Sequence, residues 1–271
     1  MKKQSKIKTF FLFLFAIPLF SFLSCSIFDF QDVQLEPLEG TIRFSVREGY
    51  HDITSISEPS IMLQMVTEKI YNQMPYYIIS WTSVNGDEIF FDIWGVDGSK
   101  AYFDMFWWAT SESFLDIANG KYSLYISYRD TTDTYILIIT DSFIKVTNDM
   151  SQFTDPLFNL LWRYPHNSFV YLCGTTTETS WICEDFLDTL LSEVDIEEFQ
   201  FPDSGTIPYP CSSGGHYYDM PAKYFFYDTD EDFDKAGEVL QSYTQRVISQ
   251  YSGVGISLTN WKNKKHYSWV F

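Results

Sequence analysis

The stretch from Lys121 to Thr147, KYSLYISYRDTTDTYILIITDSFIKVT, decides how this chain folds. Residues 121–128 and 134–146 are rich in aromatic and β-branched side chains, and Arg129-Asp130 lies between them as a turn signal. Such runs favour β-strands, because branched and aromatic side chains pack well on a pleated surface. The stretch therefore predicts a pair of adjacent strands joined as a hairpin.

Four further runs of the same kind lie upstream and extend the prediction to residues 40–148. They begin at Gly40, Tyr76, Glu88 and Lys100, and their sequences are GTIRFSV, YYIISWTSV, EIFFDIWG and KAYFDMFWW. Turn signals separate them, such as Asn85-Gly86 before the third run. Several short strands at this spacing are typical of a β-sandwich or a closed sheet.

The residues just before the hairpin carry a more specific pattern. Phe114–Leu124 reads FLDIANGKYSL, and Tyr122 follows the turn at Asn119-Gly120. The pattern resembles the corner before the penultimate strand of immunoglobulin-like domains, where a tyrosine hydroxyl bonds back to the main chain. The resemblance implies an immunoglobulin-like sandwich over 40–148. This region contains no cysteine, so no disulfide joins its sheets.

The composition changes after Asn148, where helical and strand patterns begin to alternate. Apolar spacing predicts a helix over Ser180–Val194, and Thr229 with Asp232 forms a capping box before a second helix that Gly253 ends. The predicted strands are Phe169–Cys173, Lys223–Tyr227, 254–258 and 266–271. We therefore expect a mixed fold, with an N-terminal all-β immunoglobulin-like sandwich and a small α+β domain over 149–271.

The first residues have the pattern of an export signal. Four lysines within residues 1–8 precede an apolar stretch over Thr9–Phe22, which is the order of a signal peptide. The apolar stretch is interrupted by Pro18 and is shorter than the roughly 20 residues that a transmembrane helix needs. We expect residues 1–24 to be a signal peptide, with a retained anchor helix as the alternative.

The end of this segment indicates lipid attachment. Phe22-Leu23-Ser24-Cys25 resembles the relaxed lipobox of bacterial lipoproteins, as found in spirochaetes. The resemblance implies that Cys25 carries fatty acyl chains, such as palmitate, and becomes the new N-terminus, with residues 25–39 as anchor and tether. Ser26 stands where enteric lipoproteins of the inner membrane have Asp. We therefore expect a protein anchored to the cell envelope, at the outer membrane.

The charge of the remaining chain limits its partners. Residues 1–25 hold four of the 18 basic residues and none of the 36 acidic ones, which leaves 14 basic and 36 acidic residues, a net of −22. Nucleic acids and anionic lipids would be repelled by such a surface. We expect no cofactor, and the expected partners are the membrane, through the lipid, and a protein or glycan ligand.

Three cysteines remain after Cys25. An exported domain permits disulfides, so Cys173, Cys183 and Cys211 predict one structural disulfide and one buried thiol, with the pairing left open. A rival hypothesis makes Cys183 a nucleophile at a helix start with His216 as its base. These two segments resemble NlpC/P60 cysteine peptidases and would imply a cell-envelope hydrolase, although Glu184 and Asp185 would raise the pKa of the thiol.

Two metal sites are conceivable, and neither is favoured. Cysteine and histidine side chains of the second domain, including His166, have the right chemistry for zinc but lack a close Cys-x-x-Cys pair. Asp228, Asp230 and Asp232 alternate as in calcium loops, but Phe233 stands where such a loop needs Gly. Acidic residues at a helix start are sufficiently explained by the helix dipole. We therefore expect no metal.

Aromatic residues make up 19% of the chain and are concentrated in KAYFDMFWW. Both faces of this predicted strand carry apolar side chains. Burial in a core is the favoured interpretation, and exposure for binding is the alternative. Our candidate ligand surface consists of Tyr102, Phe106, Trp107 and Trp108. The leading hypothesis is a non-enzymatic envelope lipoprotein with a binding or structural role.

Overall fold

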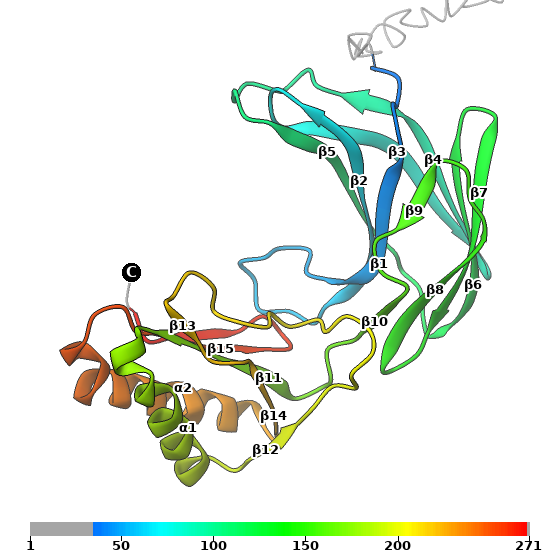
Figure 1. The fold of residues 1–271 in the computed structure, drawn as a ribbon. Helices are drawn as coiled ribbons and strands as arrows, with labels where there is room; N and C mark the ends of the chain where they lie inside the picture. The colour runs from blue at the N-terminus through cyan, green and yellow to red at the C-terminus, as the bar shows by residue number, and fades with distance from the viewer. Residues whose placement is uncertain (1–34, 270–271) are drawn as a thin grey trace, which may run out of the picture. The chain divides into compact units, whose positions relative to one another are not determined.

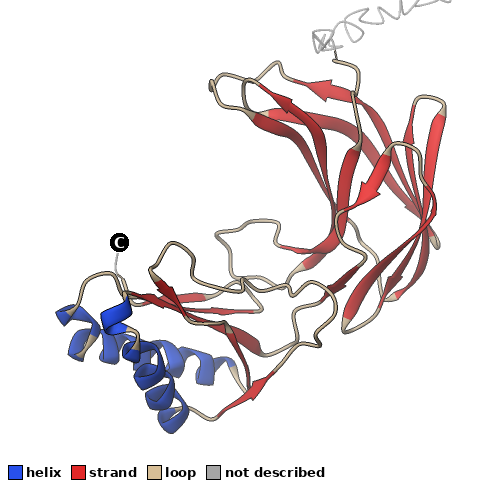
Figure 2. Cartoon of the chain, viewed as in Figure 1, coloured by secondary structure: helices blue, strands red, loops and turns tan. Residues whose placement is uncertain are grey.

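The computed structural model describes residues 35–269 (Figure 1). The expected signal peptide and the lipidation site Cys25 lie outside the described residues. The chain from Leu35 onward forms one compact unit. Strands make up 48% and helices 15% of the described residues, so this part of the protein is mainly β, with a large curled sheet and a smaller sheet (Figure 2).

The large sheet contains ten strands joined edge to edge in one hydrogen-bonded order, β10-β8-β7-β6-β4-β3-β5-β2-β1-β9. Its strands are β1 (Ile42–Gly49), β2 (Ser60–Tyr71), β3 (Tyr76–Asn85), β4 (Glu88–Asp97), β5 (Trp107–Phe114), β6 (Gly120–Tyr128), β7 (Thr131–Ile139), β8 (Phe143–Met150), β9 (Thr154–Pro156) and β10 (Leu160–Trp162). An immunoglobulin-like sandwich has two separate sheets, and here a single sheet curls instead.

One face of the curled sheet forms its core. In β7 the side chains of Asp133, Tyr135, Leu137 and Ile139 are buried and alternate with half-buried ones. The same alternation in the neighbouring strands gathers their apolar side chains into one buried cluster. A period of two places alternate side chains on opposite faces, so the sequence pattern explains why this sheet has one apolar face.

A short segment ties the two edges of the large sheet together. β9 pairs with β1 in parallel, and β10 pairs with β8 in antiparallel fashion, although only residues 157–159 separate β9 from β10. The Ile42 amide donates to the Phe153 carbonyl, at 2.9 Å, on one side of this segment. The curl is therefore fixed by residues 151–162.

The smaller sheet carries two helices on one face (Figure 2). Its order is β12-β14-β11-β15-β16, and β13 also pairs with β11. The elements are β11 (Ser168–Thr175), η1 (Thr177–Thr179), α1 (Trp181–Glu193), β12 (Ile196–Phe199), β13 (Tyr218–Asp219), β14 (Lys223–Tyr227), α2 (Asp230–Arg246), η2 (Ile248–Gln250), β15 (Gly255–Asn260) and β16 (Lys265–Tyr267). Every residue of the central strand β11 is buried, because helices cover one face and the loop around Tyr209 covers the other.

Several local predictions are confirmed. α1 lies within the expected helix, and α2 begins after the capping box, where the Thr229 amide and hydroxyl both donate to the Asp232 carboxylate at 2.9 and 2.8 Å. The Tyr122 hydroxyl donates to the Ala118 carbonyl at 2.9 Å, as a corner tyrosine should. Neither helix among residues 35–269 has the length and apolar character needed to cross a bilayer.

Other expectations are corrected. The run expected as one strand over 134–146 is two, β7 and β8, because Thr140 bonds the backbone of Ser142 and Phe143 and closes a turn. β2 was not expected, since Met, Gln, Lys and Glu in SIMLQMVTEKIY obscure its pattern. β9 and β10 belong to the large sheet, so the change from one sheet to the other falls after Trp162 and not at residue 148.

Candidate functional site

Exposed apolar side chains cluster in residues 102–108, which we call the aromatic segment. Six of its seven residues have exposed apolar side chains, and Phe106 and Tyr102 are 76% and 70% exposed. The members are Tyr102, Phe103, Met105, Phe106, Trp107 and Trp108. The four residues expected to form a ligand surface are therefore all exposed. Burying a large apolar side chain is worth about 1.5–3 kcal/mol, so a cluster of this size marks a contact surface.

The aromatic segment is held in place by the backbone. The amides of Tyr102 and Phe103 donate to the Met74 carbonyl at 3.0 and 3.1 Å, and the Met74 amide donates to the Phe103 carbonyl at 3.0 Å. β5 begins only at Trp107, which pairs with Tyr71. The expected strand over 100–108 is thus mostly a loop at the end of the sheet, and it is not buried on either face.

The first described residues lie beside Val96 at the end of β4, six residues before the aromatic segment begins. Glu36 and Val96 exchange backbone hydrogen bonds of 2.8 and 2.9 Å at the end of β4. Gly95 makes this approach feasible, because a Cβ there would lie 2.7 Å from the Glu36 carbonyl oxygen. The Leu38 amide also donates to the Tyr128 hydroxyl at 2.9 Å. The last part of the expected tether, residues 35–39, is therefore docked on the sheet.

Side chains join the same residues to the end of β2. Lys69 Nζ lies 3.2 Å from Glu39 Oε1 and 4.9 Å from the centre of the Tyr71 ring. Tyr71 stacks on Tyr76 with ring centres 4.2 Å apart. Burial, together with the carboxylates of Glu36 and Glu39, raises the pKa of Tyr71 to about 12. Residues 35–39 and the end of β2, the strand that pairs with Trp107, thus pack against each other.

A shallow groove adjoins the aromatic segment. It has a volume of about 560 Å³, and its lining includes Trp108, Leu157 and Val66. Arg43 and Glu68 also line the groove, and they form an ion pair in which Arg43 Nε lies 3.7 Å from Glu68 Oε1. An apolar wall with one exposed ion pair suits a surface contact better than an enclosed small-molecule site, which would bury most of its ligand.

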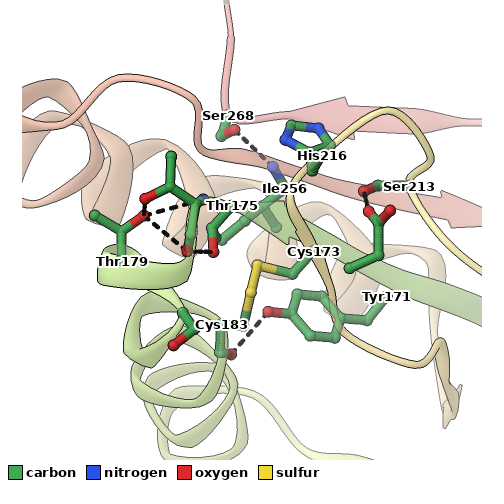
Figure 3. Close-up of a disulfide and its surroundings, with 12 residues drawn as sticks. Tyr171, Cys173, Thr175, Thr179, Cys183, Ser213, His216, Ile256 and Ser268 are labelled. Carbon is green, nitrogen blue, oxygen red and sulfur yellow. Dashed lines mark hydrogen bonds between the residues drawn. A yellow bond between two sulfur atoms is a disulfide. The ribbon is translucent and has the colours of Figure 1, made fainter.

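The cysteines form one disulfide and leave one thiol (Figure 3). Cys173 on β11 is bonded to Cys183 in α1, and both are fully buried. The Tyr171 hydroxyl donates to the Cys183 carbonyl at 2.8 Å beside the bond. Cys211 is free and exposed, so the expectation of a buried third thiol is wrong. Its place in the Pro/Gly-rich loop explains the difference, since loops lie on the surface.

The disulfide bears directly on the rival hydrolase hypothesis. Cys183 has no thiolate with which to attack a substrate while it is bonded to Cys173. His216 Nδ1 lies 3.3 Å from the Gly253 carbonyl oxygen. His216 also packs against Gly174, where a Cβ would come within 2.3 Å of its ring. The structure gives these two residues structural contacts and does not assemble a nucleophile and a base.

We expect the Cys173→Ser/Cys183→Ser variant to lose roughly 2–3 kcal/mol of unfolding free energy, because the bond closes a short loop in the unfolded chain. Urea denaturation followed by circular dichroism measures the loss. The control Cys211→Ser should lie within about 0.5 kcal/mol of wild type, since it is an exposed loop substitution. Equal stability of the double variant and the control would contradict this role of the disulfide.

The acidic residues considered for calcium are engaged with their own chain. Asp232 caps α2, and the Asp230 carboxylate lies 3.0 Å from Lys262 Nζ. Asp234 pairs with Lys264 in the same way. Within residues 35–269, no group of three or more His, Cys, Asp or Glu side chains is arranged to hold a metal ion. Neither the calcium set that includes Asp228 nor the zinc set comes together.

Sequence reasoning missed the docking of residues 35–38. Its one signal is Gly95 at the end of EIFFDIWG, because an isolated glycine in a strand often marks a close backbone approach. Comparisons of the chain with protein-family models, curated proteins and solved structures found no match. The geometry of the chain itself is therefore the basis for a functional proposal.

Proposed function

We propose that this chain is an exported envelope protein, anchored to the outer membrane by a lipid on Cys25, with a binding or structural role. Its contact surface is the aromatic segment. The observation that carries the proposal is the gathering of six exposed apolar side chains at the end of the sheet where the chain enters. A chain with a net charge of −22 after Cys25 gains nothing in solubility from such a cluster.

The surface suits a broad contact. Trp, Tyr and Phe supply large contact areas with little loss of side-chain entropy, and they dominate the energetics of interfaces. The backbone bonds to Met74 keep the segment ordered before contact, which lowers the cost of binding. A binding or structural role is therefore supported by both the composition and the rigidity of the segment.

The likeness to immunoglobulin-like domains enters the proposal only locally. The Tyr122 corner and the β6–β7 hairpin that follows it match that architecture within this stretch, although the sheet as a whole is single and curled. We propose on this basis that residues 40–148, with the closing segment 151–162, serve as a rigid all-β platform for the aromatic segment. The platform carries the contact, and the smaller sheet with its helices forms a separate core.

The lipid anchor predicts a specific chemical modification. In a bacterial host that processes lipoproteins and is fed an alkyne analogue of palmitate, the full-length chain should become labelled, because acyl chains are attached at Cys25. The Cys25→Ser variant should lose the label. A gel with fluorescent detection of the alkyne measures the labelling.

Cys211→Ser is the matched control, since Cys211 is the free, exposed cysteine of the described residues. This control should be labelled as strongly as wild type. Label that persists in Cys25→Ser, or that disappears in Cys211→Ser, would place the acyl chains elsewhere and refute the proposed anchor.

A further inference from the structure

The position of the entering chain identifies which end of the sheet faces the anchor. Residue 36 is fixed to Val96 at the end of β4, and the loop to the aromatic segment begins two residues later at Gly98. The first described residues and this loop lie at the same end of the large sheet (Figure 1). A membrane attachment upstream of Leu35 is therefore connected to the end of the large sheet that carries the aromatic segment.

The reach of the intervening chain is short. Ten residue steps separate Cys25 from Leu35, and a fully extended chain spans at most about 3.6 Å per residue, or roughly 36 Å. This upper limit is comparable to the roughly 30 Å thickness of the hydrocarbon core of a bilayer. A lipid on Cys25 would hold the end of the sheet close to the membrane surface.

The chemistry of the segment matches a membrane interface. Trp and Tyr are enriched at the headgroup level of bilayers, because their rings are apolar and carry one polar group. Trp107, Trp108 and Tyr102 supply these rings, and Phe103, Met105 and Phe106 supply apolar side chains that gain from contact with acyl chains. Asp104 within the segment and Lys100 just before it carry one charge of each sign, so this part of the chain has no preference for anionic lipid.

We propose that the aromatic segment inserts into the headgroup region of the bilayer that carries the Cys25 lipid, so that the partner of this surface is the membrane itself. This inference rests on the proposed lipid anchor for the identity of that bilayer. The lipid anchor and the aromatic segment then make two separate contacts with the bilayer. These contacts orient the large sheet so that the C-terminal end of β4 and the N-terminal end of β5 face the membrane. Two membrane contacts hold a protein more stably than one acyl anchor alone.

Quenching of tryptophan fluorescence by brominated lipid tests the inference. The full-length protein purified from bacterial membranes is reconstituted in vesicles of phosphatidylcholine brominated near the headgroup end of its acyl chains. Of the eight tryptophans, we expect Trp107 and Trp108 to be quenched. The Trp107→Phe/Trp108→Phe variant should therefore lose most of the quenching, while it keeps an aromatic ring at each position.

Trp81→Phe is the matched control. Trp81 is 53% exposed on the same sheet, but it lies five residues along β3 from Tyr76, which is roughly 17 Å from the end of the strand. This variant should retain the quenching. A second test variant, Tyr102→Ser/Phe106→Ser, keeps both reporter tryptophans and should show weaker quenching, since two inserting rings are removed.

The outcomes separate the inference from the proposed anchor, because the intact mass of each preparation reports the lipid independently. A lipidated chain whose quenching is unaffected by Trp107→Phe/Trp108→Phe, or is lost in Trp81→Phe, overturns the inference and leaves the anchor standing. A Cys25→Ser chain that is added to the same vesicles and still shows quenching at Trp107 and Trp108 supports the inference without the lipid. An unlipidated wild-type chain with quenching at these residues would refute the anchor alone.

Discussion

The Asp133→Ala variant should lose roughly 3–5 kcal/mol of unfolding free energy, because several buried donors would lose their shared acceptor, each at a cost of about 1–3 kcal/mol if it stays unsatisfied. Asp133 is fully buried on β7 and accepts hydrogen bonds from the amides of Gln152, Phe153 and Thr154 at 2.7, 3.0 and 2.7 Å. The Thr154 hydroxyl donates a fourth bond at 2.5 Å. Alanine would leave these donors buried without an acceptor.

The loss should be accompanied by loosening of the segment that ties the sheet edges. Urea denaturation measures the stability, and amide hydrogen exchange should accelerate at residues 152–155. Asp133→Asn keeps one acceptor oxygen and should lie between alanine and wild type. The exposed Asp130→Ala is the matched control, with a change within about 0.5 kcal/mol. Stability of Asp133→Ala equal to that of this control would show that the carboxylate does not hold the segment.

The second large effect is expected at Arg163, which follows β10. Its Nε lies 2.8 Å from Glu48 Oε1, and its Nη1 donates to the Asn119 side chain and the Thr140 carbonyl at 2.8 and 2.7 Å. Glu48 has only 4% of its side chain exposed. Arg163→Met would leave this carboxylate buried without its cation, which costs roughly 3–5 kcal/mol at neutral pH.

This loss should depend on pH. Burial raises the pKa of Glu48 above 4.5, although Arg163 and the Tyr164 amide act in the opposite direction. Without Arg163 the folded-state pKa rises further, so protonated Glu48 is tolerated at acidic pH and its ionisation costs stability as pH rises through that value. Arg163→Met should therefore be closer to wild type near pH 4 than at pH 8.

Two further variants separate the charge from the shape of the side chain. Arg163→Lys should retain part of the stability, because it keeps the cation but loses the planar donor geometry. Arg163→Met/Glu48→Gln should be more stable at pH 8 than Arg163→Met alone, since the unpaired charge is gone. An Arg163→Met loss that is the same at both pH values would refute the proposed dependence on Glu48.

The elements that sequence reasoning located are those fixed by neighbouring residues. The helix after Thr229 was predicted because its capping box lies within four residues, and the strand at Lys223–Tyr227 because its apolar run is short and bounded by turns. The Tyr122 corner is local in the same sense. These signals require no knowledge of the rest of the chain.

The features that were missed depend on distant partners. The closing of the sheet needs Asp133 to meet residues 152–154, about twenty positions away, and no pattern in the sequence marks that carboxylate. Apolar content identified the aromatic segment, but it favoured burial in a core, and the exposure of these side chains shows that interpretation to be wrong. The pairing of Cys173 with Cys183 likewise required the packing of α1 on β11.

The central claim is that Cys25 carries a lipid that brings the aromatic segment to a membrane. The intact mass of the full-length gene product, extracted from bacterial membranes without reductant, tests this most directly. We predict a chain that begins at Cys25 and exceeds its amino-acid mass by a diacylglyceryl group, with or without a further acyl chain, less two hydrogen atoms for one disulfide. A chain that begins elsewhere, or that begins at Cys25 without acyl groups, would contradict it.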